Sequence, residues 1–119
     1  MKVEWSMGID QNDLKIISEK VAPIAKKFGI ERVTLFGSVA RGDNDENSDY
    51  DFLISSGGIH SLFQYVDFVE TLEETLKTHV DVITESSTDE FLVETAKKGG
   101  ILIYEREHEG YSIPNNTVP

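Results

Sequence analysis

The stretch from Arg32 to Ser55 constrains the fold of this chain more than any other part of it. It holds two apolar runs of strand length, VTLF and YDFLIS, which a Gly37-Ser38 turn and a polar loop connect. Ten residues separate Ser38 from Asp49, and a single residue separates Asp49 from Asp51. Because alternate side chains of a strand point the same way, both carboxylates can face one site. The chain should therefore fold with a glycine turn beside a pair of acids.

The residue types in this stretch suit a phosphate group and a divalent metal. Gly37 has no Cβ, so its backbone can approach a phosphate closely. Ser38 adds a hydroxyl donor, and the free N–H groups of a following helical turn add more. Asp49 and Asp51 supply the hard oxygen ligands that suit Mg²⁺, and two metals about 3.5–4 Å apart could hold both the attacking and the leaving oxygen. The pattern indicates transfer of a nucleotide group from a nucleoside triphosphate.

A third carboxylate is expected from a neighbouring strand, because two acids leave such a metal site short of ligands. Asp81 is the candidate, since it stands between valines in the strand-like run 79–84 and an unpaired acid there is costly to bury. The alternative is that Asp81 lies on a solvated strand face, with Val80 and Val82 on the buried face. Beside the Gly-Ser and Asp-x-Asp elements, we favour the ligand interpretation.

The runs GSVARG (37–42) and SDYDFL (48–53) resemble the signature of minimal nucleotidyltransferases of the DNA polymerase β-like superfamily. The resemblance covers about residues 32–104, Asp81 fits the family's third carboxylate, and Tyr50 departs from the commoner β-branched aliphatic residue. It implies a polymerase β-like core and Mg²⁺-dependent transfer of a nucleoside monophosphate, with two Mg²⁺ ions and ATP as the default donor. The site residues it implies are Asp49, Asp51 and Asp81 for catalysis and metal, and Gly37, Ser38 and Arg41 for the nucleotide.

Arg41 closely follows the phosphate turn and has two interpretations. Its guanidinium could contact triphosphate oxygens, or it could form a salt bridge with the acidic loop that follows. The loop acids are expected to be solvated or to recognise a basic partner: Asp43, Asp45 and Glu46. Three scattered histidines lack the spacing of metal ligands, and we expect none of them to bind metal: His60, His79 and His108. Two aromatic residues are expected to pack rather than to stack on a base: Tyr65 and Phe68.

The charge balance argues against nucleic acid as a partner. Eleven Lys and Arg against 22 Asp and Glu give a formal net charge of −11, whereas nucleic-acid binding normally depends on basic residues. A polymerase role is therefore not expected; the acidic surface suits a basic macromolecule or a cationic small molecule, or serves solubility alone. The chain has no cysteine, no apolar stretch of membrane-spanning length and no signal-peptide core, which together predict a cytoplasmic protein.

Hydrophobic periodicity predicts an α/β (α+β) fold, in which helices flank a small mixed sheet. The expected helices are 13–28, capped by Asp10 or Asn12 and kinked or broken at Pro23; 62–76; and one ending at Lys98 behind a Ser87/Glu90 capping box. The expected strands are 32–36, 50–55, 79–84 and 101–104, with a short helical turn over 39–41. We expect a single nucleotidyltransferase domain over 1–104 and a flexible tail over 105–119.

The acceptor of the nucleotide is expected on another protein, because 119 residues leave no room for a second substrate-binding domain. Short forms of this kind resemble the antitoxin half of two-gene systems, whose partner is a helical HEPN-domain ribonuclease toxin. The resemblance implies transfer of AMP to a tyrosine hydroxyl of that toxin within a hetero-oligomer, with Asp81 helping to deprotonate the hydroxyl. Two alternatives stay open: an aminoglycoside-type enzyme with a small cationic acceptor, and an antitoxin that acts by binding alone.

Overall fold

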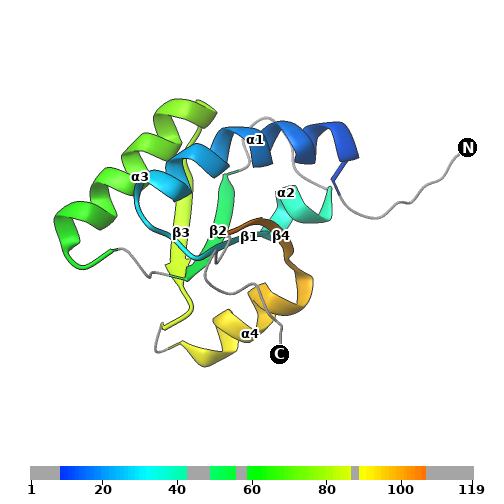
Figure 1. Ribbon diagram of the computed structural model, residues 1–119. Helices are drawn as coiled ribbons and strands as arrows, with labels where there is room; N and C mark the ends of the chain where they lie inside the picture. The colour runs from blue at the N-terminus through cyan, green and yellow to red at the C-terminus, as the bar shows by residue number, and fades with distance from the viewer. Residues whose placement is uncertain (1–8, 43–48, 56–58, 87–88, 107–119) are drawn as a thin grey trace, which may run out of the picture.

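A computed structural model describes residues 9–42, 49–55, 59–86 and 89–106 of the chain (Figure 1). Helices and strands alternate along most of this length, as the periodicity predicts. In chain order the elements are α1 (Gln11–Lys27), β1 (Arg32–Phe36), α2 (Gly37–Arg41), β2 (Tyr50–Ser55), α3 (Leu62–Leu76), β3 (Val80–Thr84), α4 (Glu90–Gly99) and β4 (Ile101–Glu105).

The strands form one mixed sheet in the order β3-β2-β1-β4. β1 pairs antiparallel with both β2 and β4, whereas β2 pairs parallel with β3. α3 connects β2 to β3 and provides the long crossover that a parallel pair requires. The expected mixed sheet is confirmed, and β3 is one of its two edges.

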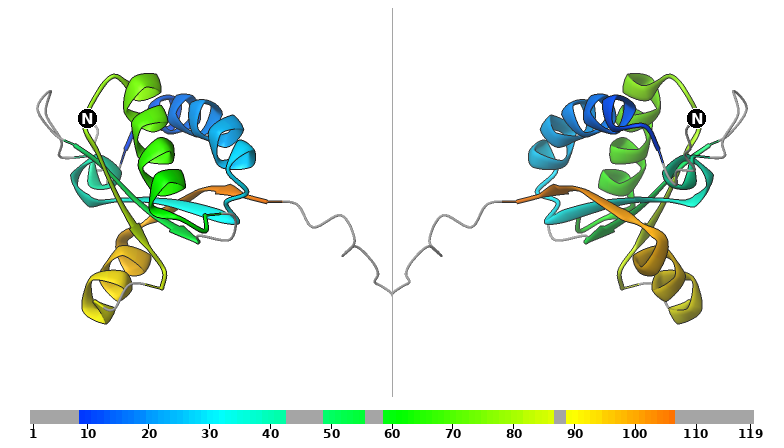
Figure 2. Two further views of the ribbon diagram at one scale, coloured as in Figure 1. Left: turned by 90° about the vertical axis from the view of Figure 1, so that its left-hand side faces the viewer. Right: turned by 90° about the vertical axis from the view of Figure 1, so that its right-hand side faces the viewer.

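Helices cover the two faces of this sheet unequally. α1 and α3 lie side by side over one face, and α4 lies on the opposite face (Figures 1 and 2). In β2, Phe52 and Ile54 are buried in the core formed with α1 and α3, whereas Leu53 packs with Val93 and Ala96 of α4. Successive strand residues thus point to opposite faces, as strand geometry requires.

The smaller core under α4 leaves part of its face uncovered. Among the described residues, this core contains Leu53, Val93 and Ala96 together with the partly buried Phe36 and Ile83. Asp51 and Asp81 stand two positions before Leu53 and Ile83 and lie on the same face of the sheet. They lie outside the part of that face that α4 covers. The fold therefore leaves one end of β2 and β3 open on the α4 face.

Most strand boundaries agree with the prediction, and two differ slightly. β3 begins at Val80, one residue later than expected, and β4 extends to Glu105, one residue further. The N–H of Arg106 donates to the carbonyl of Glu31 at 2.8 Å, so the sheet region continues past the predicted boundary at residue 104. The remainder of the predicted tail, 107–119, lies outside the described residues.

α1 begins at Gln11, two residues earlier than predicted. Asp10 caps it by accepting a hydrogen bond from the N–H of Asn12 at 3.2 Å. Pro23 lies inside the helix without ending it, so of the kink or break predicted there the break was wrong. Proline at this position removes one intrahelical hydrogen bond, and the buried apolar face of α1 against the sheet stabilises the helix on both sides of it. None of the described helices is both long enough and apolar enough to cross a membrane.

The start of α4 corrects the predicted capping box. The helix begins at Glu90, and Asp89 is its cap, because its carboxylate accepts from the N–H of Leu92 at 3.0 Å. Glu90 is therefore the first helical residue and not the third, and Ser87 lies outside the described residues. A carboxylate caps a helix as well as a hydroxyl does, so the local sequence offered two competing starts.

Candidate active site

The parallel pairing of β2 and β3 brings the predicted acids together at the open end of the sheet. Asp51 lies directly opposite Asp81 in register, and the charge of Asp81 acts on the Asp51 carboxyl group. Asp49, just before β2, belongs with Asp81 to a group whose ligand atoms all lie within 4.8 Å of one another. Residues 30 positions apart in the sequence thus form one acidic cluster; their roles as metal ligands remain a prediction.

Asp81 is exposed, whereas its neighbours Val80 and Val82 are buried. The premise that Asp81 is an acid in need of a partner inside an apolar strand was therefore wrong. Its solvated face is nevertheless the face that carries Asp51. Asp81 was interpreted either as a metal ligand or as an acid on a solvated strand face. Both interpretations fit the same position, because the exposed side of β3 is also the side that carries the acidic cluster.

The crowding of carboxylates changes the acidity of Asp51. Burial raises the pKa of the half-buried Asp51, and the negative charges of Asp81 and Asp49 raise it further. A hydrogen bond that the protonated Asp51 donates to Asp81 acts in the same direction, whereas the charge of Arg41 lowers the pKa. Acids that disfavour one another's ionisation in this way form a site that a cation would stabilise.

Gly37 has a structural role that the sequence did not reveal. It is the first residue of α2 and has a φ of 80°, a backbone conformation that side chains disfavour. A Cβ at this position would overlap Oδ2 of Asp51. Glycine is therefore required here for the close approach of α2 to the carboxylate, in addition to any approach of the backbone to a phosphate.

Ser38 and Arg41 also belong to α2, which begins two residues earlier than the predicted turn. Ser38 is half-buried and Arg41 is exposed. The charge of Arg41 lowers the pKa of Asp51, so this guanidinium acts on the acidic cluster. The acids proposed as its other partners, in the loop 43–48, lie outside the described residues.

His79 is the residue that the sequence analysis missed. Its Nε2 lies 3.2 Å from Oδ1 of Asp81, and its Nδ1 lies 3.0 Å from Oε2 of Glu73. Desolvation lowers the pKa of His79, but the charges of Asp49, Asp81 and Glu73 outweigh this effect and raise it. The signal was present: His79 precedes Asp81 by two positions, as Asp49 precedes Asp51. The scattered positions of the histidines in the sequence did not indicate which of them lies near the acids, because strand pairing decides which residues meet.

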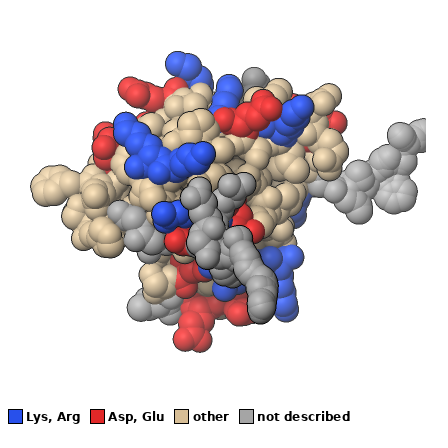
Figure 3. Space-filling model, viewed as in Figure 1, with Lys and Arg blue, Asp and Glu red and all other residues tan. Residues whose placement is uncertain are grey.

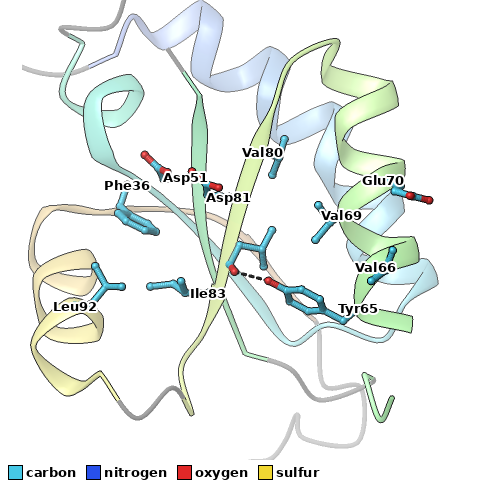
Figure 4. Close-up of a pocket in the computed structure, with 11 residues that line it drawn as sticks. Phe36, Asp51, Tyr65, Val66, Val69, Glu70, Val80, Asp81, Ile83 and Leu92 are labelled. Atoms are coloured by element: carbon cyan, nitrogen blue, oxygen red, sulfur yellow. Dashed lines mark hydrogen bonds between the residues drawn. The ribbon is translucent and has the colours of Figure 1, made fainter. Parts of the chain in front are cut away.

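A largely apolar groove of about 600 Å³ begins at Asp51 and Asp81 and runs around the edge strand β3 (Figure 4). α3 lines one side of the groove and α4 the other. Its apolar lining consists of Phe36, Val66, Val69, Val80, Val82, Ile83 and Leu92. A concave apolar surface that ends at polar groups is the usual form of a ligand site.

Tyr65 and Phe68 act as packing residues. The hydroxyl of Tyr65 donates to the backbone carbonyl of Val82 at 2.6 Å, which ties α3 to the edge strand (Figure 4). The carboxylate of Glu73 accepts from the N–H of Val80 at 3.1 Å, on the same strand. Phe68 is fully buried against Phe28. Side chains of α3 therefore occupy backbone groups of β3 that an added strand would use.

A profile of the polymerase β nucleotidyltransferases matches residues 19–109. The chain belongs to this family. The matched range contains the glycine turn, the Asp-x-Asp pair and Asp81, so the whole acidic cluster lies within the region that defines the family. The chain is accordingly a nucleotidyltransferase, as the sequence motif predicts.

Relatives of this nucleotidyltransferase have names that specify their own chemistry further. A candidate protein adenylyltransferase of Methanocaldococcus jannaschii is 42% identical over 71 residues, which are 60% of this chain and 76% of the relative. Protein adenylyltransferase MntA of Thermococcus cleftensis is 31% identical over 80 residues, which are 67% of this chain and 81% of the relative. The nucleotidyltransferase is thus similar to proteins named for transfer of AMP to other proteins.

Solved structures share the fold of this nucleotidyltransferase. A candidate minimal nucleotidyltransferase is 31% identical, with a TM-score of 0.67 over 78% of this chain and 95% of that one. A toxin–antitoxin complex with AMP-PNP has a TM-score of 0.67 at 18% identity, over 76% of this chain and 74% of the matched one. A complex of a tri-AMPylated HEPN toxin of Shewanella oneidensis with MNT antitoxin has a TM-score of 0.61 at 15% identity, over 78% of this chain and 73% of the matched one. The last two similarities show the fold alone.

Proposed function

We propose that this nucleotidyltransferase is an antitoxin that transfers AMP from ATP to a tyrosine hydroxyl of a cognate HEPN ribonuclease toxin. The observation that carries the proposal is the convergence of Asp49, Asp51 and Asp81 at the open end of the sheet. Relatives named protein adenylyltransferases supply the reaction class. Complexes of the same fold with HEPN toxins supply the class of partner.

The acidic cluster suits Mg²⁺. Asp49, Asp51 and Asp81 offer carboxylate oxygens, and burial together with the charges of Asp81 and Asp49 raises the pKa of Asp51, as expected of a cation site. We assign these three residues as the ligands of two Mg²⁺ ions. When bound, the metal would neutralise charge on the transferred phosphoryl group and on the leaving pyrophosphate.

The donor nucleotide belongs beside α2. Gly37 and Ser38 lie where β1 meets α2, and the close approach of Gly37 to Asp51 puts this turn next to the acids. We assign the triphosphate to Gly37 and Ser38, with Arg41 as a further phosphate ligand. A guanidinium suits phosphate oxygens, and its charge already acts on the cluster.

The acceptor hydroxyl would approach Asp81, which is exposed. Its carboxylate can accept the hydroxyl proton while the tyrosine oxygen forms a bond to the α-phosphorus of ATP. The bond from that phosphorus to its bridging oxygen then breaks, and pyrophosphate leaves with the electron pair. The role of this chain in the reaction is to hold the acceptor and the donor in line and to take up the proton.

The surface around the groove supports a protein as the acceptor. Large apolar side chains at the starts of α3 and α4 are highly exposed: Leu62 by 74%, Phe63 by 88% and Phe91 by 82%. Figure 3 shows uncharged atoms over the projecting start of α3 on the left and acidic side chains over α4 below. Exposed apolar groups with charged neighbours are typical of protein interfaces. The net charge of −11 also favours a basic partner over an acidic one.

The groove itself favours a second candidate function. Its volume of about 600 Å³ is sufficient for a drug-sized molecule, and its two acids could bind a cationic one. A small cationic acceptor, as in aminoglycoside-modifying enzymes, would then replace the protein. Turnover of free cationic acceptors by the purified protein, without a partner, would favour this alternative.

Label transfer distinguishes these functions. The purified protein is incubated with Mg²⁺, α-labelled ATP and a HEPN protein encoded by a neighbouring gene. We expect label on the HEPN protein, AMP on a tyrosine by mass spectrometry, and background transfer with Asp49→Ala or Asp51→Ala. A HEPN protein that remains unlabelled would contradict the proposal. Full protection of cells by the Asp49→Ala variant would instead indicate an antitoxin that acts by binding alone.

A further inference from the structure

Two short motifs face each other across the β2–β3 pair. Asp49 and Asp51 are separated by one residue, and so are His79 and Asp81. The register pairs Tyr50 with Val80 and Asp51 with Asp81, and the N–H of Tyr50 donates to the carbonyl of His79 at 3.1 Å. His79 therefore lies beside Asp49 as Asp81 lies beside Asp51. The site has a fourth member, an imidazole, that the Asp-x-Asp motif does not contain.

The orientation of the His79 ring is fixed from outside the cluster. Its Nδ1 lies 3.0 Å from Oε2 of Glu73 on α3. The same oxygen accepts from the N–H of Val80 at 3.1 Å, so this carboxylate is itself held in place. Histidines that bind metals commonly donate their second ring N–H to such a carboxylate, which sets the tautomer and the direction of the ligating nitrogen.

The remaining nitrogen of His79 points into the cluster. Nε2 lies 3.2 Å from Oδ1 of Asp81, and the ligand atoms of Asp49, His79 and Asp81 all lie within 4.8 Å of one another. Ligands across a metal ion are separated by about 4 Å, because each bond is about 2.0–2.2 Å long. Small side-chain rotations would therefore bring all three onto one ion.

We propose that Nε2 of His79 is a metal ligand, which together with Asp49 and Asp81 forms a mixed nitrogen–oxygen site for a divalent transition metal such as Mn²⁺. A nitrogen ligand favours transition metals over Mg²⁺, which prefers oxygen. Glu73 is the positioning residue that orients the imidazole. The inference shares Asp49 and Asp81 with the proposed function but concerns which metal the site selects.

The competing explanation is an ordinary surface ion pair. The side chains of His79 and Asp81 are 59% and 57% exposed, and ion pairs this exposed contribute little to stability. An ion pair explains the contact between His79 and Asp81. The proposal depends on Asp49 as well, because its ligand atom lies within 4.8 Å of those of His79 and Asp81 although Asp49 comes from outside β3.

Pulsed electron paramagnetic resonance on the full-length protein with Mn²⁺ tests the proposal directly. At pH 8.0, with one equivalent of Mn²⁺, we expect ¹⁴N modulation from a coordinated imidazole in the wild type and its loss in His79→Gln. Titration of free Mn²⁺ should show an affinity at least about tenfold weaker in His79→Gln, with a smaller loss in Glu73→Gln. The affinity for Mg²⁺ should change much less in both variants.

His60→Gln is the matched control, because His60 is an exposed histidine outside the cluster. It should retain both the ¹⁴N modulation and the Mn²⁺ affinity of the wild type. Bound Mn²⁺ without ¹⁴N modulation in the wild type, no Mn²⁺ binding at all, or unchanged affinity in His79→Gln would each overturn the inference. The wild-type spectrum does not depend on how any variant folds. Transfer of AMP with Mg²⁺ alone, measured on the same samples, tests the proposed function separately.

Discussion

The two faces of the sheet use the same strands for different purposes. On the face under α1 and α3, Leu35, Phe52 and Ile54 are fully buried. On the opposite face α4 covers only part of the strands, and Asp51 and Asp81 remain at the open end. Because successive strand residues point to opposite faces, the residue next to a core side chain can be a site residue. Stability and chemistry are therefore divided between the faces, and substitutions on each face should have different consequences.

A substitution in the core on the face covered by α1 and α3 should have the largest effect on stability. Phe68 of α3 is fully buried, and its ring packs edge-on against Phe28 with centroids 5.4 Å apart. Phe68→Ala leaves a cavity that the surrounding helices cannot fill completely. We expect it to lower the free energy of unfolding by about 3–5 kcal/mol in urea denaturation, a large share of the total for a small domain.

Phe91→Ala is the control for this substitution. Phe91 of α4 is 82% exposed, so the same change of side chain should alter the free energy of unfolding by no more than about 0.5 kcal/mol. If the two variants lost equal stability, the division between the covered and the open face would be wrong. A loss of binding to the proposed HEPN partner in Phe91→Ala, at unchanged stability, would place that partner on the open face.

A substitution in the turn between β1 and α2 should show an intermediate effect. Gly37→Ala introduces a Cβ at a φ of 80° and against Oδ2 of Asp51. We expect a loss of about 1–3 kcal/mol in the free energy of unfolding, together with a loss of AMP transfer because Asp51 is displaced. Urea denaturation and the label-transfer assay measure the two effects on the same sample.

Gly99→Ala provides the matched comparison. A Cβ added to Gly99, the last residue of α4, meets nothing within 4 Å. This variant should be as stable as the wild type or more stable by up to about 1 kcal/mol, because alanine favours a helix over glycine. Normal AMP transfer by Gly37→Ala would show that the contact with Asp51 is not needed for activity.

Strand periodicity predicted much of this arrangement. The bounds of β1 and β2, and the helix α3, follow from alternation and from helical spacing of apolar residues, which are local properties. The start of α4 was missed, because Ser87 and Asp89 are competing caps and local sequence does not rank them. Pro23 was expected to kink or break α1, and the helix is not broken there because its burial against the sheet outweighs the loss of one hydrogen bond.

The site was predictable where it depends on sequence spacing and not where it depends on pairing. Asp49 and Asp51 are two residues apart, so a single strand brings them together. The position of His79 beside Asp49 depends on the register of β2 and β3, which only the folded sheet defines. The contact of Gly37 with Asp51 likewise joins two elements, and no local pattern signals it.

A substitution of Asp51 should make the metal-free protein more stable. Asp51 is half-buried, and burial and the charges of Asp81 and Asp49 raise its pKa in the folded protein above the usual 3.8. Above its folded pKa the ionised Asp51 therefore destabilises the metal-free protein, and this penalty disappears as the pH falls through the folded pKa towards 3.8. Asp51→Asn removes the charge while it preserves the shape of the side chain.

In the presence of a chelator, Asp51→Asn should therefore unfold a few degrees above the wild type at neutral pH, with a difference that vanishes in acid. Added Mg²⁺ should reverse the order, because it stabilises only the chain that retains its carboxylates. AMP transfer should be lost throughout. Thermal unfolding at several pH values, with and without Mg²⁺, measures this reversal. A variant less stable than the wild type in chelator at neutral pH would mean that Asp51 contributes to the fold as the covered face does, and the division between the two faces would not hold.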